Sequence, residues 1–218
     1  MKNKNKEIVI ALSKGRILEQ SLPLLAEAGI KPLESIKESR KLIFPTTNPK
    51  IKLLVVRASD APTYVEYGAA DLGIAGKDVL LEAECKNIFE LVDLKVGKCR
   101  LCVAKRQDTA ELDKTAILKV ASKYVKSAAQ YFAEQGRQVR LIKLYSSMEL
   151  APLVDLADCI VDLVDTGNTL RANGLEVAET IREISSRLIV NRASFTLKRE
   201  ELLPIVRAIE TAVENRKN

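Results

Sequence analysis

The sequence predicts an α/β fold with mainly parallel sheets. Short apolar segments alternate with amphipathic segments along most of the chain, the connections are short, and polar glycine-containing loops follow several apolar segments. Such alternation is typical of parallel strands joined through helices that cover the sheet. Ligands in these sheets bind beyond the carboxyl ends of the strands, often where two domains face each other. We therefore expect functional residues in the loops that follow strands.

The first half of the chain predicts four strands and three helices. The expected strands are Ile8–Leu12, Leu42–Phe44, Ile51–Val56 and Asp71–Ala75. The expected helices run from Ile17 to about Ala28, from Pro62 to about Tyr67, and onward from Gly76-Lys77-Asp78. Gly29 supplies the stop signal of the first helix, and Pro62 suits the first turn of the second.

The same alternation starts again near Asp93–Lys98, where we expect a second unit to begin. Its expected strands are Cys99–Ala104, Ile117–Val120, Val139–Leu144 and Ile160–Val164, with a helix over Val125–Glu134. The last segment, Lys198–Asn215, has apolar residues at positions 202, 203, 206, 209 and 213, which form one stripe of a helix. The sequence shows no internal repeat.

Composition narrows the class of protein. The chain has 218 residues and is 47% hydrophobic, which suffices for one large or two small domains. The net charge of +6 is spread along the sequence, and five Tyr, four Phe and no Trp leave little for base stacking. Anionic small substrates therefore explain the charge better than nucleic acid does. No apolar run approaches the ~20 residues of a membrane span, and no signal peptide is apparent, so we expect a cytoplasmic protein.

The chain contains no histidine. This absence excludes Ser-His-Asp and Cys-His hydrolysis, His-ligated zinc and any imidazole acid–base step. Four cysteines are present, and Cys99-Arg-Leu-Cys102 matches the C-x-x-C pattern of redox and zinc sites. The pair lies in an expected strand and no further ligands complete a zinc site, so we interpret these cysteines as small buried residues.

The segment Ile160–Leu175 carries the strongest functional signal. An apolar strand with Asp162 and Asp165 leads directly into Thr166-Gly167-Asn168-Thr169. Such a loop bares consecutive backbone N–H groups, adds threonine hydroxyls, and precedes a helical turn near Leu170, as a sugar-phosphate site requires. The two carboxylates suit ribose hydroxyls or a magnesium ion. The alternative interpretation is a turn that caps a helix.

Three further groups of residues are candidates for binding anions. The loop Ser13-Lys14-Gly15-Arg16 places two cations at a helix start, where they oppose the helix dipole unless an anion is bound. Gly73-Ile-Ala-Gly76-Lys77-Asp78 gives a glycine pair before a helix, with Asp78 as its cap, and a structural role suits it as well. Arg40 is suited either to a phosphate or to an ordinary surface ion pair.

Three collinear motifs resemble the ATP phosphoribosyltransferase family, which begins histidine biosynthesis. They are Ala11–Arg16, Asp71–Asp78 and Glu149–Leu170, and the resemblance continues through Ile184–Asn191. The length resembles the short form of the family, without the C-terminal regulatory domain of the long form. The family usually has Pro at Ser13, Thr at Ala75, Gly at Asp155 and Pro at Arg192. The first two departures flank the expected ligand loops.

The resemblance implies a two-domain fold similar to type II periplasmic binding proteins, with an interdomain cleft. Its first domain would comprise residues 1–94 and 180–218, and its second domain, residues 95–179, would carry the sugar-phosphate loop. The implied reaction joins ATP through N1 to the anomeric carbon of 5-phosphoribosyl 1-pyrophosphate and releases pyrophosphate. Adenine N1 already has a lone pair, so this reaction needs no strong base and the lack of histidine is no obstacle.

The resemblance also implies roles for particular residues. Asp162, Glu149 and Arg16 would act in catalysis. The phosphoribosyl pyrophosphate would lie on Asp162, Asp165, Thr166, Gly167, Asn168 and Thr169. The ATP would lie on Lys14, Gly15, Arg16, Arg40, Gly76, Lys77 and Asp78. The cofactor would be Mg²⁺, held through the substrates, with Asp162 as the alternative direct ligand.

Short-form relatives resemble catalytic subunits that work with a regulatory protein similar to histidyl-tRNA synthetase. We therefore expect such a partner, a homodimer within a hetero-oligomer, and neither nucleic acid nor membrane as partners. Two alternatives remain: a non-catalytic anion-binding domain of the same fold, and a phosphoribosyltransferase for a free base. The first has no need for Asp162 and Asp165 beside the threonines, and the second has no need for Lys14, Arg16 and Arg40.

Overall fold

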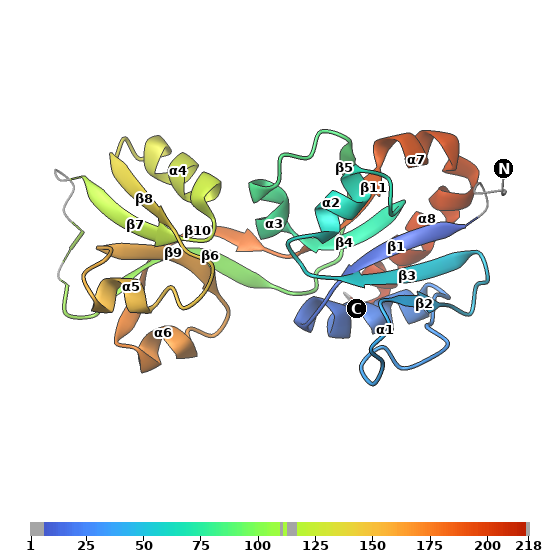
Figure 1. Ribbon diagram of the computed structural model, residues 1–218, viewed down its shortest axis with the longest axis horizontal. Helices are drawn as coiled ribbons and strands as arrows, with labels where there is room; N and C mark the ends of the chain where they lie inside the picture. The colour runs from blue at the N-terminus through green and yellow to red at the C-terminus, as the bar shows by residue number, and fades with distance from the viewer. Residues whose placement is uncertain (1–6, 110, 113–116, 217–218) are drawn as a thin grey trace. The chain divides into compact units, whose positions relative to one another are not determined.

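The computed structural model describes residues 7–109, 111–112 and 117–216 and divides into two compact units (Figure 1). Unit 1 is formed by the chain up to Gly97 together with the chain from Ser185 onward, and unit 2 by Lys98–Ile184. The chain thus passes between the units at positions 97/98 and 184/185, a few residues after the expected 94/95 and 179/180. The α/β class is confirmed.

Unit 1 is built on a six-stranded sheet in the order β2-β3-β1-β4-β11-β5. The strands are β1 Ile8–Ser13, β2 Ile43–Pro45, β3 Ile51–Val56, β4 Leu72–Gly76, β5 Ile88–Asp93 and β11 Ser186–Asn191. The helices are α1 Arg16–Glu27, α2 Ala61–Glu66, α3 Lys77–Glu82, α7 Arg192–Leu197 and α8 Arg199–Asn215. Strand β1 is parallel to both neighbours, β3 and β4, whereas β2, β5 and β11 pair antiparallel.

Strand β1 explains how both faces of this sheet are covered. Its side chains alternate, because successive residues of a strand point to opposite faces. Ile10 and Leu12 join the core beneath α1 and α8, where they meet Leu24 and Ile209. Ala11 joins the smaller cluster on the other face, which includes Val65 of α2. The all-apolar strand predicted from sequence is therefore a central strand buried on both sides.

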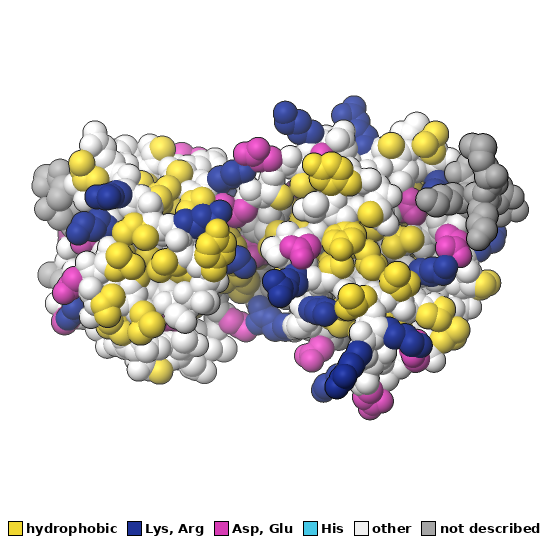
Figure 2. All heavy atoms as spheres, in the orientation of Figure 1, with side chains coloured by type: hydrophobic (Ala, Val, Ile, Leu, Met, Phe, Trp, Pro, Cys, Tyr) yellow, Lys and Arg dark blue, Asp and Glu magenta, His cyan; other side chains and the backbone are white. Residues whose placement is uncertain are grey.

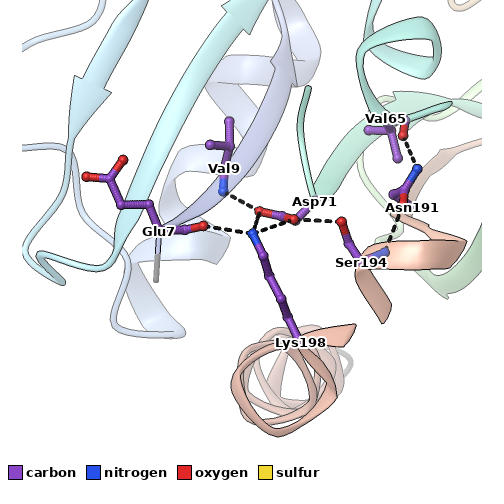
Figure 3. A network of polar contacts seen from close by, with 7 residues as sticks. All are labelled: Glu7, Val9, Val65, Asp71, Asn191, Ser194 and Lys198. Atoms are coloured by element: carbon purple, nitrogen blue, oxygen red, sulfur yellow. Dashed lines mark hydrogen bonds and ion pairs between the residues drawn. The ribbon is translucent and has the colours of Figure 1, made fainter. Parts of the chain in front are cut away.

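A polar network fastens the C-terminal part of unit 1 to its strands (Figure 3). Asp71, just before β4, is only 5% exposed. Its carboxylate accepts hydrogen bonds from the Val9 amide (3.0 Å), the Ser194 hydroxyl (2.7 Å) and the Lys198 ammonium (2.9 Å). Asn191 adds a bond from its side-chain amide to the Val65 carbonyl at 2.8 Å. The buried carboxylate is thus compensated by three donors, one of which is charged.

Unit 2 is built on a five-stranded sheet in the order β10-β6-β9-β7-β8. The strands are β6 Cys99–Arg106, β7 Leu118–Ser122, β8 Val139–Lys143, β9 Cys159–Val164 and β10 Leu175–Ile184. The helices are α4 Val125–Glu134, α5 Leu150–Leu153 and α6 Asn168–Ala172. Strand β7 is parallel to β8 and β9, and β6 is antiparallel to β9 and β10. Cys99 and Cys102 lie buried on β6 as free thiols, which agrees with their predicted role.

The two sheets share one topology although the sequence shows no repeat. In each, one strand (β1 or β7) is parallel to both of its neighbours, and two strands with antiparallel pairing complete that side of the sheet, so β3-β1-β4-β11-β5 corresponds to β8-β7-β9-β6-β10. The chain order also corresponds, because β1-α1-β3-α2-β4-α3 becomes β7-α4-β8-α5-β9-α6, with only β2 inserted in unit 1. The loops that follow β1, β3 and β4 in unit 1 therefore correspond to those that follow β7, β8 and β9 in unit 2.

Two of the four departures from the family pattern have a clear structural setting. Asp155 has a φ of +55°, the left-handed region in which glycine is the least strained residue. Ser13 is fully buried, and its hydroxyl donates to the Ile74 carbonyl at 2.9 Å.

No helix among the described residues is long and apolar enough to cross a membrane.

Candidate functional site

The predicted sugar-phosphate loop lies at the carboxyl end of β9 in unit 2. Strand β9 ends at Val164, the loop follows, and α6 begins at Asn168. Asp165, Thr166 and Asn168 are exposed. Within the part of the chain that the structure describes, the backbone amides of Thr166 and Gly167 donate to no protein acceptor. Both donors are thus available to a bound anion, as the loop hypothesis requires.

Gly167 gives the loop its shape. Its φ is +75°, and a Cβ added there would lie 3.1 Å from the Arg171 Nη1 atom. The guanidinium of Arg171 donates through Nη2 to the Asn168 side-chain oxygen at 2.5 Å, so a cation lies directly beside the loop. Sequence reasoning missed Arg171. The signal was its spacing, because residues three apart in a helical turn meet on one face.

The two carboxylates assigned to catalysis lie in the same unit. Asp162 is half-buried in β9, pairs across the sheet with Cys102, and accepts the Leu163 amide through Oδ1 at 2.8 Å. Glu149 is half-buried at the N-cap of α5, which packs against β9. Asp162 therefore lies on the strand that leads into the loop, and Glu149 lies at the start of a helix that packs against this strand.

The donors present suit magnesium only in combination with a substrate. Among the described residues, no group of three or more His, Cys, Asp or Glu side chains is arranged to hold a metal ion. Magnesium in proteins commonly takes one or two carboxylates and completes its shell with substrate phosphates and water. Asp162 and Asp165 fit that pattern, because they could supply one or two carboxylates while the substrate supplies the remaining ligands.

Unit 1 contains a pocket of about 1020 Å³ between α1 and the segment 31–42. Its wall is apolar, with Leu18, Leu22 and Ile36, and its cations are Lys14, Lys31, Lys37, Arg40 and Lys41. Figure 2 shows Lys and Arg side chains gathered over this part of unit 1. Lys14, Gly15 and Arg40, which are far apart in sequence, thus line one pocket. Such a pocket suits a ligand with one apolar and one strongly anionic part.

Hydrogen bonds to neighbouring strands position the cationic loop. The Ser13 hydroxyl reaches β4, and the Lys14 amide donates to the Val56 carbonyl at the end of β3 (2.9 Å). Gly15 has a φ of +84°, which turns the chain into α1. Arg16 is the first residue of α1 and is exposed, and its side chain is not among those that line the pocket.

The other residues predicted to bind ATP have structural partners. Lys77 forms an ion pair with Glu90 of β5 at 2.6 Å, and its amide donates to the Ser185 carbonyl. Asp78 is buried, and a Cβ on Gly76 would lie 2.2 Å from its Oδ1 atom. None of the three lines the pocket of unit 1. Gly76, Lys77 and Asp78 therefore shape the start of α3.

Two pKa shifts bear on chemistry outside the loops. Burial raises the pKa of the Cys159 thiol to about 12, and the nearby Asp158 carboxylate adds to this effect, so that sulfur is no nucleophile at neutral pH. For Asp93, burial raises the pKa, but hydrogen bonds from Lys95 and Ser185 and the charge of Arg187 outweigh it and lower the pKa to about 2.

A two-unit α/β fold with such a loop and a cation-lined pocket is typical of proteins that bind phosphorylated small molecules. Comparison with known proteins narrows this class. Residues 57–211 match the family model described as ATP phosphoribosyltransferase. The chain therefore belongs to the ATP phosphoribosyltransferase family, pentosyltransferases that catalyse the first step of histidine biosynthesis.

Individual relatives support this assignment over almost the full chain. ATP phosphoribosyltransferase from Marinobacter nauticus is 54% identical over 211 residues, covering 97% of this chain and 98% of the relative. The Pseudomonas syringae pv. syringae enzyme is 57% identical over 209 residues, with 96% and 98% covered. The solved ATP phosphoribosyl transferase (HisG:HisZ) complex from Thermotoga maritima matches with a TM-score of 0.81 and 29% identity, covering 97% and 100%.

Proposed function

We propose that unit 2 binds phosphoribosyl pyrophosphate and unit 1 binds ATP for the transfer that the family performs. N1 of ATP would attack the anomeric carbon, giving N1-(5-phosphoribosyl)-ATP and pyrophosphate. The observation that carries the proposal is the loop Asp165–Thr169, with its two available amides and its left-handed glycine. Consecutive backbone donors at the end of a strand bind a phosphate without needing a side-chain charge.

The chemistry asks for positioning rather than for a strong base. Adenine N1 carries its own lone pair, and pyrophosphate leaves as a stable anion. The main tasks are to hold two polyanions in line and to stabilise the charge that develops on the leaving group. A chain without histidine can perform both tasks through amides, hydroxyls, carboxylates and cations.

The sugar substrate would be held along β9 and the loop. The 5-phosphate would accept from the amides of Thr166 and Gly167 and from the hydroxyl of Thr169. Asp162, four residues before Thr166 on the strand, would accept from the ribose hydroxyls, with Glu149 as the second carboxylate. Arg171 beside the loop would add positive charge near the 5-phosphate.

The ATP would occupy the pocket of unit 1. Its apolar wall would receive the base, and Lys14 and Arg40 would hold phosphates, with Arg16 reaching either ATP or the departing pyrophosphate. Lys41 is already paired with Glu34 at 2.8 Å, whereas no carboxylate pairs with Lys14 or Arg40 among the described residues. Unpaired cations at one pocket favour an anionic ligand, because their mutual repulsion is relieved when it binds.

We further propose three features that accompany this activity. Mg²⁺ would bind with the substrates and offset phosphate charge. The chain would work in the cytoplasm, as a homodimer assembled with a regulatory subunit that resembles histidyl-tRNA synthetase. The HisG:HisZ complex of the Thermotoga maritima relative supports a partner of this kind.

The direct test is pyrophosphate release with ATP, phosphoribosyl pyrophosphate and Mg²⁺, omitting each in turn and with the regulatory subunit present and absent. Release that needs both substrates, together with the adduct seen by mass spectrometry, supports the proposal. Release without ATP but with a free base would point to a free-base transferase. Binding of the sugar substrate without any turnover, even with the partner present, would favour the binding-domain alternative.

A further inference from the structure

The shared topology of the two units reveals a residue that motif reading did not find. In unit 1, β1 ends in Ser13, and Lys14 follows. In unit 2, the corresponding strand β7 ends in Ser122, and Lys123 follows. The dipeptide Ser-Lys therefore stands at the carboxyl end of corresponding strands, β1 and β7, in the two sheets. The residues that follow differ between the two loops, so their correspondence is recognised only from the strand order.

The two serines do the same structural work. The Ser13 hydroxyl donates to the Ile74 carbonyl on the neighbouring parallel strand β4, and the Ser122 hydroxyl donates to the Val161 carbonyl on β9 at 2.6 Å. Both serines are fully buried. Ser122 also accepts the Tyr124 amide at 2.8 Å, which fixes the chain on the far side of Lys123. The Ser122 hydroxyl therefore fixes the residues on both sides of Lys123: Ser122 itself through the bond to Val161, and Tyr124 through the bond from its amide.

The register of the sheet places Lys123 next to the proposed substrate site. Ser122 pairs with Val161 in the parallel ladder between β7 and β9. Lys123 and Asp162 are the residues that directly follow this pair, and neighbouring strands of a sheet lie about 5 Å apart. The loop Asp165–Thr169 begins three residues further along, about 10 Å at the rise of a strand.

The side chain of Lys123 is exposed and available. Its ammonium lies 5.8 Å from the centre of the Tyr124 ring, and no carboxylate pairs with it in the described part of the chain. Lys143 at the end of β8 has the same setting, with its ammonium 5.6 Å from the Tyr145 ring, but β7 separates β8 from β9. Lys123 therefore directly follows β7, the strand next to β9, whereas Lys143 ends the strand one further away.

We propose that Lys123 binds the 1-pyrophosphate of phosphoribosyl pyrophosphate, with Ser122 as its positioning residue. The inference rests on the proposed placement of the 5-phosphate at Asp165–Thr169. With the ribose hydroxyls at Asp162, the anomeric carbon and its pyrophosphate extend away from the loop, toward the level of Lys123. A cation there binds the substrate and stabilises the pyrophosphate as the bond to the anomeric carbon breaks. Lys123 would thus bind a substrate phosphate in unit 2, as we propose for Lys14 in unit 1.

The test compares two ligands that differ only in the pyrophosphate. Calorimetric binding of phosphoribosyl pyrophosphate and of ribose 5-phosphate is measured for the unmodified chain and for Lys123→Gln, Lys123→Arg and Lys143→Gln. We expect Lys123→Gln to weaken phosphoribosyl pyrophosphate about tenfold or more, the usual scale for a lost charged contact, and ribose 5-phosphate less than about twofold. Lys123→Arg should retain most of the affinity, and Lys143→Gln should leave both ligands unchanged.

Each other outcome overturns the proposal in a recognisable way. Equal loss for both ligands would place Lys123 at the 5-phosphate, and no loss for either would remove it from the site. Equal losses of affinity in Lys123→Gln and Lys143→Gln would show that only the overall positive charge of unit 2 matters and not a contact made by Lys123. Failure of the unmodified chain to bind either ligand would overturn the loop assignment itself, which separates failure of the proposed function from failure of this inference.

Discussion

Ser13 and Ser122 make the same hydrogen bond in two sheets that share no recognisable sequence repeat. Each ends the strand that is parallel to both of its neighbours, is fully buried, and donates to a carbonyl on a neighbouring parallel strand. A buried hydroxyl with one good acceptor stabilises by about 1 kcal/mol, but its larger effect is to fix where the following loop begins. In both units the next residue is a lysine.

The glycine of the sugar-phosphate loop should be essential for binding rather than for folding. Gly167→Ala introduces a Cβ at a φ of +75° and 3.1 Å from Arg171 Nη1, so we expect about 1 kcal/mol of destabilisation and loss of phosphoribosyl pyrophosphate binding. Gly136→Ala is the matched control, because Gly136 has a φ of +66° but nothing within 4 Å. Denaturant unfolding and calorimetry on both variants test this. Equal binding by both would contradict the role of Gly167.

The pair Asp71–Lys198 should matter for stability far more than surface pairs do. The side chain of Asp71 is 6% exposed and that of Lys198 is 21% exposed. Removing one partner leaves a buried charge uncompensated, so Lys198→Met should lower the free energy of unfolding by about 3 kcal/mol. The exposed pair Lys52–Glu7 is the comparison, and Lys52→Met should cost less than about 1 kcal/mol. Similar losses of unfolding free energy in both variants would show that the buried network of Figure 3 stabilises the fold no more than an exposed ion pair does.

Asp93 should make unit 1 sensitive to acid. Its pKa is about 2 in the folded chain against the ordinary 3.8, so the unfolded chain binds the proton more readily. The stabilisation is fully present above about pH 4 and is lost as the pH falls toward 2. We expect Asp93→Asn to be less stable at neutral pH and to flatten the stability profile between these values. An unchanged profile for Asp93→Asn between pH 4 and 2 would sink the assignment.

Asp155 should be a position where stability can be gained. Its φ of +55° is strained for a side chain, and its ion pair with Arg106 is long, at 3.8 Å, with the Asp155 side chain 91% exposed. Asp155→Gly should therefore raise the free energy of unfolding by about 1 kcal/mol, measured as an increase in Tm. A decrease in Tm would mean that the ion pair outweighs the backbone strain.

The sequence predicted those strands and loops whose signal lies in consecutive residues. The central strands are apolar on both faces, and Asp165–Thr169 carries its turn chemistry in consecutive residues. By contrast, β5 and β10 were not predicted, because both expose much of their surface and show no apolar alternation. Their existence depends on pairing with β11 and β6.

The site residues that sequence reasoning missed depend on strand order. Lys123, which we propose as a site residue, lies 39 residues before Asp162 in the chain, and the β7–β9 ladder pairs the residues that directly precede them. Lys14 and Arg40 were each predicted from their own segments, but the fold was needed to show that they line one pocket. Lys77, which was predicted to bind ATP, forms an ion pair with Glu90 that the sequence did not indicate.

The central claim is that unit 1 holds ATP and unit 2 holds the sugar substrate, and a crossed kinetic measurement tests it directly. Steady-state KM values for both substrates are determined for Lys14→Met and Thr169→Val, with the regulatory subunit present. We predict that Lys14→Met raises the KM for ATP about tenfold and leaves that for phosphoribosyl pyrophosphate nearly unchanged, and that Thr169→Val does the opposite. If either variant raised both values equally, or raised the value of the other substrate, the division of the site between the two units would be wrong.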